Sequence, residues 1–468
     1  MREPNRRLDA SQIYGSREGH ITARIRYLGL ALSIALLAAA AAALASTGAL
    51  SPKGCIADPI NNPDGCAKIA AGLDHAQSVA VSPDRNSVYA IGDYDSAIVR
   101  FDRDTTTGAL TPKGCVADAD HNPDNCTKTA NGLDGAALVA VSPDAKSVYA
   151  TSGIESGDNA VVRFNRDTTT GALAPKGCIA DPANNPDGCT KTAPGLDGVY
   201  GVAVSADGKS VYVAGTSDNA IVRFDRDPTT GALKPKGCVG DADNNPDNCT
   251  KTVSGLDGPI SVAVSPDGRS VYATSFYDNA IVRFDRDPTT GALKPKGCIA
   301  DPANNPDGCT KTGIGLDAAY SVAVSADGKS AYAAGLFDNA IVRFRRDATT
   351  GALAAKDCIA DPANNPDGCA NTAKGLDGIH SVVVSPDGKS VYAVGDGDDA
   401  IARFDRDTTT GGLTPKGCIA DPTDNPDNCV NTAKGLYGAI SVAVSPEGTS
   451  VYATGPNDNA LVLFDRSL

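Results

Sequence analysis

The chain has 468 residues, a formal net charge of −14, 14 cysteines, 49 glycines and no tryptophan. An acidic chain of this kind lacks the basic surface that nucleic acids require, so we expect no nucleic-acid partner. Length alone suggests several domains, but that expectation fails for a repeat protein, so internal repeats decide the domain organisation.

The first 45 residues differ from the rest. Six arginines precede residue 27, and an uncharged stretch, YLGLALSIALLAAAAAALA, runs from Tyr27 to Ala45. It ends in Ala-Leu-Ala, the small-x-small pattern of a signal peptidase site, so residues 1–45 are predicted to be an export signal. The alternative is an uncleaved membrane anchor, because about 20 apolar residues span a bilayer. We therefore expect a secreted, periplasmic or cell-surface protein, with membrane contact only through this segment.

The cysteines occur as seven C-x10-C pairs, 60 residues apart except for one step of 63. Zinc would need two further ligands for each pair, and only His121 lies inside any of these loops. Disulfides, which persist in exported proteins, are therefore favoured. The predicted bridges are Cys55–Cys66, Cys115–Cys126, Cys178–Cys189, Cys238–Cys249, Cys298–Cys309, Cys358–Cys369 and Cys418–Cys429.

Each repeat carries four strand signals, as residues 257–298 show. SVAVS and SVYAT flank the turn SPDG, in which Pro and Gly stand where a hairpin turn needs them. NAIVRFDRD is the third strand, and GALKPKG, after the turn DPTTG, is a short fourth strand whose proline suits a sheet edge. Four short strands with turns at regular intervals predict a β-propeller blade.

The repeat count predicts how the ring closes. The chain contains seven three-stranded cores and seven fourth strands, beginning with a lone fourth strand (48–54) and ending with three strands (441–466). Residues 46–468 are therefore predicted to form one all-β domain, a monomeric seven-bladed propeller of four-stranded blades. The N-terminal strand should complete the C-terminal blade. An open β-solenoid is the alternative, but it would not need these offset ends.

SVAVSPDGRSVYA (261–273), DNAIVRFDRD (278–287) and TTGAL (289–293) resemble the YVTN-type repeats of seven-bladed lactonase-like propellers, including 6-phosphogluconolactonase-like proteins. The resemblance covers all seven units and implies the propeller fold. It implies no catalytic residue, because the matching residues belong to strands and turns. The cysteine loops and the near-identity of the units depart from the enzymes of that family.

The seven cysteine loops hold 17 aspartates and no lysine or arginine. They should lie at the same face as the loop after the second strand, here called the top face. The leading hypothesis is a binding or cell-envelope interaction module whose acidic top face engages an unknown ligand, cation or protein. A passive envelope protein is a further alternative.

Two sets of loop residues are candidates for cation binding. Carboxylate and amide oxygens at every second position suit calcium, although no cofactor is required by any motif. These calcium candidates are Asp118, Asp120, Asn122 and Asp124 in one loop and Asp241, Asp243, Asn245 and Asp247 in another. A recurring GLD motif, placed just before the innermost strand, supplies the ligand-binding candidates Asp74, Asp134, Asp197, Asp257, Asp317 and Asp377.

Catalysis requires groups that differ from one another, whereas the repeats supply near-copies. The positions that break the repeat on the top face are therefore the candidates for an enzyme site. They comprise His75, Glu155 and His380 as catalytic candidates and Gln77, Tyr200 and Tyr320 as ligand-binding candidates. If the protein is an enzyme, which the sequence leaves open, we expect a lactonase-type hydrolase of a sugar lactone at the top of the channel.

Overall fold

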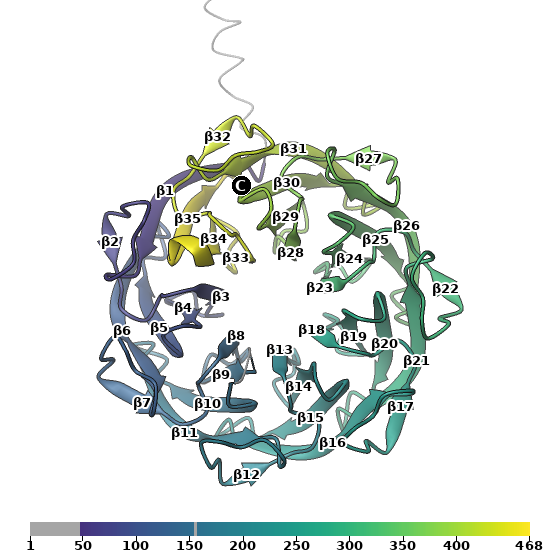
Figure 1. Cartoon of the computed structure of the whole chain (residues 1–468), viewed down its shortest axis with the longest axis horizontal. Helices are drawn as coiled ribbons and strands as arrows, with labels where there is room; N and C mark the ends of the chain where they lie inside the picture. The colour runs from purple at the N-terminus through teal and green to yellow at the C-terminus, as the bar shows by residue number, and fades with distance from the viewer. Residues whose placement is uncertain (1–46, 154–156) are drawn as a thin grey trace, which may run out of the picture. The chain divides into compact units, whose positions relative to one another are not determined.

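The computed structural model describes residues 47–153 and 157–468, in which seven five-stranded β-sheets follow one another around a central channel (Figure 1). Each sheet is one blade, and we number the blades by the order of their innermost strands. These residues contain a single short 3-10 helix, η1 (Pro456–Asp458). The predicted all-β, seven-bladed propeller is confirmed.

The strands of each blade are given from the channel outward. Blade 1 comprises β3 (Ala76–Val81), β4 (Ser87–Gly92), β5 (Ala97–Arg103), β6 (Leu110–Asp118) and β7 (Lys128–Ala130). Blade 2 comprises β8 (Ala136–Val141), β9 (Ser147–Ser152), β10 (Ala160–Arg166), β11 (Leu173–Ala180) and β12 (Lys191–Thr192). Blade 3 comprises β13 (Val199–Val204), β14 (Ser210–Gly215), β15 (Ala220–Arg226), β16 (Leu233–Asp241) and β17 (Lys251–Val253).

The remaining blades repeat this order. Blade 4 comprises β18 (Pro259–Val264), β19 (Ser270–Ser275), β20 (Ala280–Arg286), β21 (Leu293–Ala300) and β22 (Lys311–Thr312). Blade 5 comprises β23 (Ala319–Val324), β24 (Ser330–Gly335), β25 (Ala340–Arg346), β26 (Leu353–Ala360) and β27 (Asn371–Thr372). Blade 6 comprises β28 (Ile379–Val384), β29 (Ser390–Gly395), β30 (Ala400–Arg406), β31 (Leu413–Ala420) and β32 (Asn431–Thr432). Blade 7 comprises β33 (Ser441–Val444), β34 (Ser450–Gly455), β35 (Ala460–Arg466), β1 (Leu50–Ala57) and β2 (Lys68–Ile69).

The hydrophobic core lies between consecutive blades. The second strand of every blade is buried along its whole length, because it is covered on both faces by neighbouring blades. In one such layer Tyr272 and Ile281 of blade 4 pack with Val322 and Phe344 of blade 5. Small and β-branched residues fill this space at the spacing that two packed sheets require.

The blades have a fifth strand that the sequence analysis did not predict. In blade 4, β22 pairs in parallel with the outer end of β21, with Ile299 opposite Lys311 and Ala300 opposite Thr312. The disulfide Cys298–Cys309 folds the connection back on itself, which brings these two residues alongside the strand they have just left. A pairing of only two residues leaves too weak a sequence pattern to be recognised as a strand.

The ring closes as predicted, through strands from opposite ends of the described chain. β1 runs antiparallel to β35, with Ile56 opposite Leu461 and Ala57 opposite Ala460. The N–H of Gly48 also donates to the carbonyl of Ser467 at 2.7 Å.

An arginine joins each pair of neighbouring blades on the face opposite the cysteine loops. At the junction of blades 4 and 5, Arg346 donates from Nε to the hydroxyl of Tyr272 at 2.8 Å and from Nη2 to Asp267 at 2.8 Å. Tyr272 in turn donates to the carbonyl of Gly351 at 2.6 Å. Five other junctions repeat this arrangement with Arg166, Arg226, Arg286, Arg406 and Arg466. At the remaining junction Arg103 contacts Tyr452 in the same way, but Glu447 takes the place of the aspartate.

All seven predicted disulfides are present, with Cα–Cα distances of 5.2 to 5.4 Å. They indicate an oxidising, extracytoplasmic environment. The predicted export signal lies outside the described residues. Within the described part, no helix is both long enough and apolar enough to cross a membrane.

Candidate functional site

One position in each blade places a side chain at the mouth of the channel. It is the second residue of the innermost strand in blades 1 to 6 and the residue just before that strand in blade 7. In several blades it coincides with a β-bulge between the innermost strand and the next. A bulge leaves one residue without a cross-strand partner and redirects its side chain. In chain order the position holds Gln77, Ala137, Tyr200, Ile260, Tyr320, His380 and Ile440. Four polar residues therefore interrupt an otherwise apolar set.

Three of these polar side chains contact one another. The hydroxyls of Tyr200 in blade 3 and Tyr320 in blade 5 lie 2.8 Å apart, so the pair bridges two blades that are not neighbours. The ring of Tyr320 also meets the imidazole of His380 edge to face, with centroids 4.7 Å apart. Burial raises the pKa of Tyr200 and Tyr320 above the usual value, so both hydroxyls keep their protons at neutral pH.

The carbonyl of Gly378 fixes the proton on the imidazole of His380, and Asp396 lies nearby. Nδ1 of His380 lies 2.9 Å from the carbonyl oxygen of Gly378 and 3.6 Å from Oδ1 of Asp396. A carbonyl oxygen cannot donate, so Nδ1 carries the proton and Nε2 of the neutral ring keeps a lone pair. This arrangement makes Nε2 a proton acceptor.

A second histidine occupies the mouth at blade 1. Nδ1 of His75 lies 3.3 Å from Oδ2 of Asp93 and 3.1 Å from Nε2 of Gln77, and its ring stacks on Tyr94 at 4.3 Å. The charge of Asp93 adds to burial in raising the pKa of Tyr200, so the two groups of side chains share one electrostatic environment. We call His75, Gln77, Asp93, Tyr200, Tyr320, His380 and Asp396 the channel-mouth cluster.

His75 adopts a backbone conformation that favours glycine. Its φ is 54°, and five of the six equivalent positions hold glycine, namely Gly135, Gly198, Gly258, Gly378 and Gly438, with Ala318 the sixth. A non-glycine residue in this region costs about 1 kcal/mol. Strain of this kind is a reason to suspect a functional residue, because the ordinary choice at this position avoids it.

The sequence analysis missed Asp93 and Asp396, although the same comparison of repeats could have found them. Both residues directly follow the second strand of their blade, where the other units carry Gly153, Thr216, Phe276, Leu336 and Pro456. Glu155, the third catalytic candidate, lies outside the described residues.

The aspartates of the GLD motif lie beside the loops rather than within this cluster. The backbone N–H of Asp257 donates to Asp278, and that of Asp377 donates to Asp398 at 2.8 Å. The seventh unit keeps the same backbone bond with Tyr437 in place of aspartate, donating to Asp458 at 2.9 Å. The feature that all seven units share is therefore the hydrogen bond from the backbone N–H at this position, and not the aspartate side chain. Asp74, Asp134, Asp197 and Asp317 donate in the same way.

The calcium candidates of one cysteine loop each contact different groups of residues. Asn122 brackets its disulfide, accepting from the N–H of Cys126 at 2.7 Å and donating to the carbonyl of the same residue at 3.0 Å. Asn245 does the same with Cys249. Asp118 and Asp124 lie in separate groups of carboxylates, as do Asp241 and Asp247, whereas Asp120 and Asp243 are exposed.

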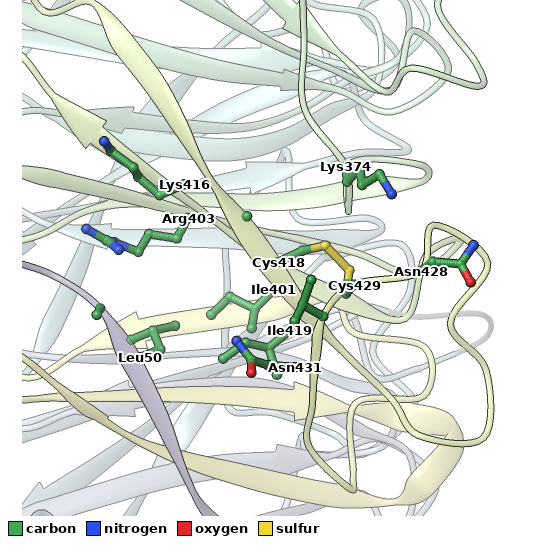
Figure 2. A pocket seen from close by; sticks show the side chains of 13 residues that line it. Leu50, Lys374, Ile401, Arg403, Lys416, Cys418, Ile419, Asn428, Cys429 and Asn431 are labelled. Atoms are coloured by element: carbon green, nitrogen blue, oxygen red, sulfur yellow. A yellow bond between two sulfur atoms is a disulfide. The ribbon is translucent and has the colours of Figure 1, made fainter. Parts of the chain in front are cut away.

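A pocket of about 410 Å³ lies on the outer wall, where β31 meets the beginning of the described chain (Figure 2). Leu50, Ile401, Arg403, Lys416 and the Cys418–Cys429 bridge line it. Smaller pockets of about 80 Å³ occupy the equivalent positions of blades 2 and 4. The pocket is therefore a repeated seam of the propeller wall, widened in one blade.

Comparison with known proteins identifies the family. The family described as "Lactonase, 7-bladed beta-propeller" matches residues 77–242 and 197–306. This is a lactonase-like seven-bladed propeller.

Solved structures support the fold of this lactonase-like propeller. A periplasmic gluconolactonase from Pseudomonas aeruginosa is 17% identical, with a TM-score of 0.52 over 77% of this chain and 90% of that chain. A protein from Lactobacillus plantarum is 16% identical, with a TM-score of 0.55 over 77% and 89%. No curated protein matches the sequence.

The lactonase-like fold does not by itself assign a reaction. Hydrazine synthase from Kuenenia stuttgartiensis is 17% identical, with a TM-score of 0.53 over 85% of this chain and 97% of that chain. Because one scaffold carries such different names, function must be argued from the side chains at the channel mouth.

Proposed function

We propose that this lactonase-like propeller is an exported hydrolase of a sugar lactone, acting at the channel mouth. The observation that carries the proposal is His380, whose Nδ1 donates to the carbonyl of Gly378, so that Nε2 is left to accept a proton. The neighbouring hydroxyls of Tyr320 and Tyr200 supply donors for an oxyanion. The seven disulfides support an extracytoplasmic location, whether secreted, periplasmic or on the cell surface.

The residues account for each step of ring opening. Nε2 of His380 takes a proton from water as the water oxygen bonds to the lactone carbonyl carbon. A tyrosine hydroxyl donates a hydrogen bond to the carbonyl oxygen, which gains negative charge. The ring C–O bond then breaks, and the proton returns from His380 to the departing alkoxide. The product is the open-chain hydroxy acid.

The charge of the site favours a neutral lactone over a phosphorylated one. Asp93 and Asp396 lie at the channel mouth, and the cysteine loops of the top face contain no lysine or arginine. A phosphate group needs cationic or N–H donors to offset its charge. We therefore expect δ-gluconolactone to react faster than its 6-phosphate.

The experiment is hydrolysis of δ-gluconolactone by the full chain, measured as acid release above the spontaneous rate. We expect His380→Ala to lower kcat/KM by about 10²- to 10⁴-fold, the usual contribution of a general base. His121→Ala is the matched control, because His121 is exposed in a cysteine loop and its contacts are with Ser96 and Asp134, neither of which belongs to the cluster. Equal activity of the two variants would contradict the proposed base. Binding of the sugar without hydrolysis would favour a binding module instead.

A further inference from the structure

Three aspartates from three separate segments meet beside each of several blades. In blade 3 they are Asp181 from the preceding cysteine loop, Asp218 from the loop between β14 and β15, and Asp247 from the following cysteine loop. One carboxylate oxygen of each lies within 4.8 Å of the other two. We call such a group a carboxylate triad. The other triads that meet this distance include Asp58–Asp95–Asp124, Asp118–Asp158–Asp187, Asp241–Asp278–Asp307 and Asp64–Asp421–Asp458.

The repeat places the same residue types in the two remaining blades. These are Asp301, Asp338 and Asp367 in blade 5 and Asp361, Asp398 and Asp427 in blade 6. The charges that act on Asp338 come from Asp367, Asp301 and Asp317, and those on Asp398 come from Asp427, Asp361 and Asp377. Of the 17 aspartates in the cysteine loops, 14 occupy triad positions, and only Asp120, Asp243 and Asp424 do not.

The triad of blade 3 buries negative charge among other carboxylates, whereas in the triad of blade 7 Lys434 lies near Asp64. Asp181 is 1% exposed and Asp218 is 6% exposed. Burial, followed by the charges of Asp247, Asp181 and Asp197, raises the pKa of Asp218 to about 7. Ionised carboxylates are expensive to bury unless a proton or a cation offsets their charge.

Backbone N–H groups hold each carboxylate, and in three triads they leave one buried oxygen unused. In the other four, Oδ2 of the first aspartate accepts from a leucine N–H, as Asp118 does from Leu133 and Asp241 from Leu256. Oδ1 of Asp181 accepts from the N–H of Ala183 at 2.7 Å, and Oδ2 of Asp218 accepts from that of Asp197 at 2.7 Å. Oδ2 of Asp181 has no hydrogen-bond partner, and its atom is buried. The same is true of Oδ2 in Asp58 and Asp361, each 1% exposed. Since Oδ1 of Asp181 is already engaged, the oxygen left to face the triad is the unpartnered one.

We propose that the carboxylate triads bind calcium, one ion to each blade. Calcium takes only oxygen ligands, at about 2.3–2.6 Å, so two oxygens on opposite sides of the ion lie up to about 5 Å apart. The oxygens of each triad lie within 4.8 Å of one another, which is compatible with ligands of one such ion. Magnesium requires about 2.1 Å and near-octahedral geometry and usually keeps several waters, so a site built from protein oxygens suits it less well. Backbone carbonyls or water would complete the coordination.

The triads explain what the acidic loops contribute. Each ion would tie a blade's hairpin loop to the cysteine loops before and after it, and each cysteine loop would contribute to two successive sites. The calcium ligands are thus drawn from neighbouring loops rather than from alternate positions within one loop. This inference is independent of the reaction at the channel mouth.

The test measures calcium content and thermal unfolding of the full chain. After equilibrium dialysis against CaCl2, we expect about seven ions per chain, and Asp218→Asn should lose one. The melting temperature should rise by on the order of 10 °C between EGTA and CaCl2, because several sites bind only the folded chain. MgCl2 should give a much smaller rise. The control is Asp243→Asn, an exposed carboxylate in the same loop as Asp247.

The direction in which Asp218→Asn changes the melting temperature distinguishes a cation site from a purely structural role. With calcium, Asp218→Asn should melt at a lower temperature than the parent chain, because a ligand is lost. With EGTA it should melt at a higher temperature, because one of three repelling carboxylates is gone. A decrease of equal size in both solutions would overturn the proposal. So would equal melting of the parent chain in EGTA and CaCl2, or an equal effect of magnesium.

Discussion

Arg346 shows how a single side chain fastens two blades. The side chain of Arg346 is 1% exposed. Its guanidinium donates to Tyr272, to the carbonyl of Gly328 and to Asp267, on the face of blades 4 and 5 opposite the cysteine loops. Its chain neighbour Arg345 is exposed. The two positions therefore form a matched pair, with the same residue type in the same strand.

We expect Arg346→Ala to lower the free energy of unfolding by about 3 kcal/mol, since Asp267 loses its cationic partner and the hydroxyl of Tyr272 loses the donor that faces it. Arg345→Ala should change it by less than about 0.5 kcal/mol. Denaturant unfolding of both variants under non-reducing conditions would measure the difference. Equal losses would show that the junction does not depend on this arginine.

The same junctions predict how acid destabilises the protein. Burial alone would raise the pKa of Asp267, but hydrogen bonds from Ser265 and Arg346 outweigh it and hold that pKa below the usual value. Asp84, Asp144, Asp207, Asp327 and Asp387 show the same direction. A depressed pKa contributes stability that is present above the unfolded value of about 4 and is lost as the pH falls through the folded value.

We therefore expect the free energy of unfolding to drop as the pH falls below about 4. Asp267→Asn should be less stable than the parent chain at neutral pH, and this difference should shrink in acid. The measurement is denaturant unfolding at a series of pH values, with EGTA present throughout to exclude effects of bound cations. A difference that stays constant with pH would contradict the assignment.

At the residue scale, the sequence identified most of the channel-mouth cluster but not its contacts. Comparing repeats selected His75, Gln77, Tyr200, Tyr320 and His380 because each breaks the common pattern. It could not show that Tyr200 reaches Tyr320 from a blade that is not its neighbour, since that contact depends on the diameter of the channel. Comparison of the repeats also overlooked the triad aspartates in the loop after the second strand. They recur in every repeat, and only residues that differ between repeats were selected.

The cysteine loop is the element that combines most features of the top face. Its disulfide folds the connection back, its residues add the fifth strand, and its two recurring aspartates enter two different triads. Strands one to four were predictable, since each has a hydrophobic pattern and a turn at its end. The loop's role was not predictable, because its aspartates meet partners about 30 to 70 residues away in the chain, and much farther away where the ring closes.

We expect removal of one disulfide, in the double variant Cys238→Ser/Cys249→Ser, to cost up to about 3 kcal/mol in the chain-entropy model for a loop of this length. The loss should be accompanied by weaker calcium binding, because Asp241 and Asp247 belong to the same loop. Denaturant unfolding and equilibrium dialysis would measure the two effects. Unchanged stability together with unchanged calcium content would show that the loop keeps its shape without the bridge.

At the scale of the whole molecule, the propeller is fastened differently on its two faces. Arginine–aspartate–tyrosine contacts join the blades on the turn side, whereas buried carboxylates gather on the cysteine-loop side. Much of the acidic character of the top face is therefore internal, since the first aspartate of every cysteine loop is buried. The channel mouth, where the repeats differ, is left as the part of this face best suited to a specific ligand.

The closure of the ring gives the last prediction. Ile56 in β1 and Ile299 in β21 occupy the same position in their blades, opposite Leu461 and Ile281 respectively. β21 is tethered to its partner by a short turn, whereas β1 reaches β35 only through the folded ring. Releasing β1 therefore frees far more chain entropy, which grows with the logarithm of the closed length.

Proline at either position removes one backbone donor and disturbs the pairing of its strand. We expect Ile56→Pro to lower the melting temperature more than Ile299→Pro does. In Ile56→Pro, β1 can separate from β35 completely, whereas in Ile299→Pro the turn between β20 and β21 keeps β21 beside its partner. Hydrogen exchange should show fast exchange across β35 in Ile56→Pro, with β20 still protected in Ile299→Pro. Equal melting and equal protection would mean that closure through β1 contributes no more than any other outer strand.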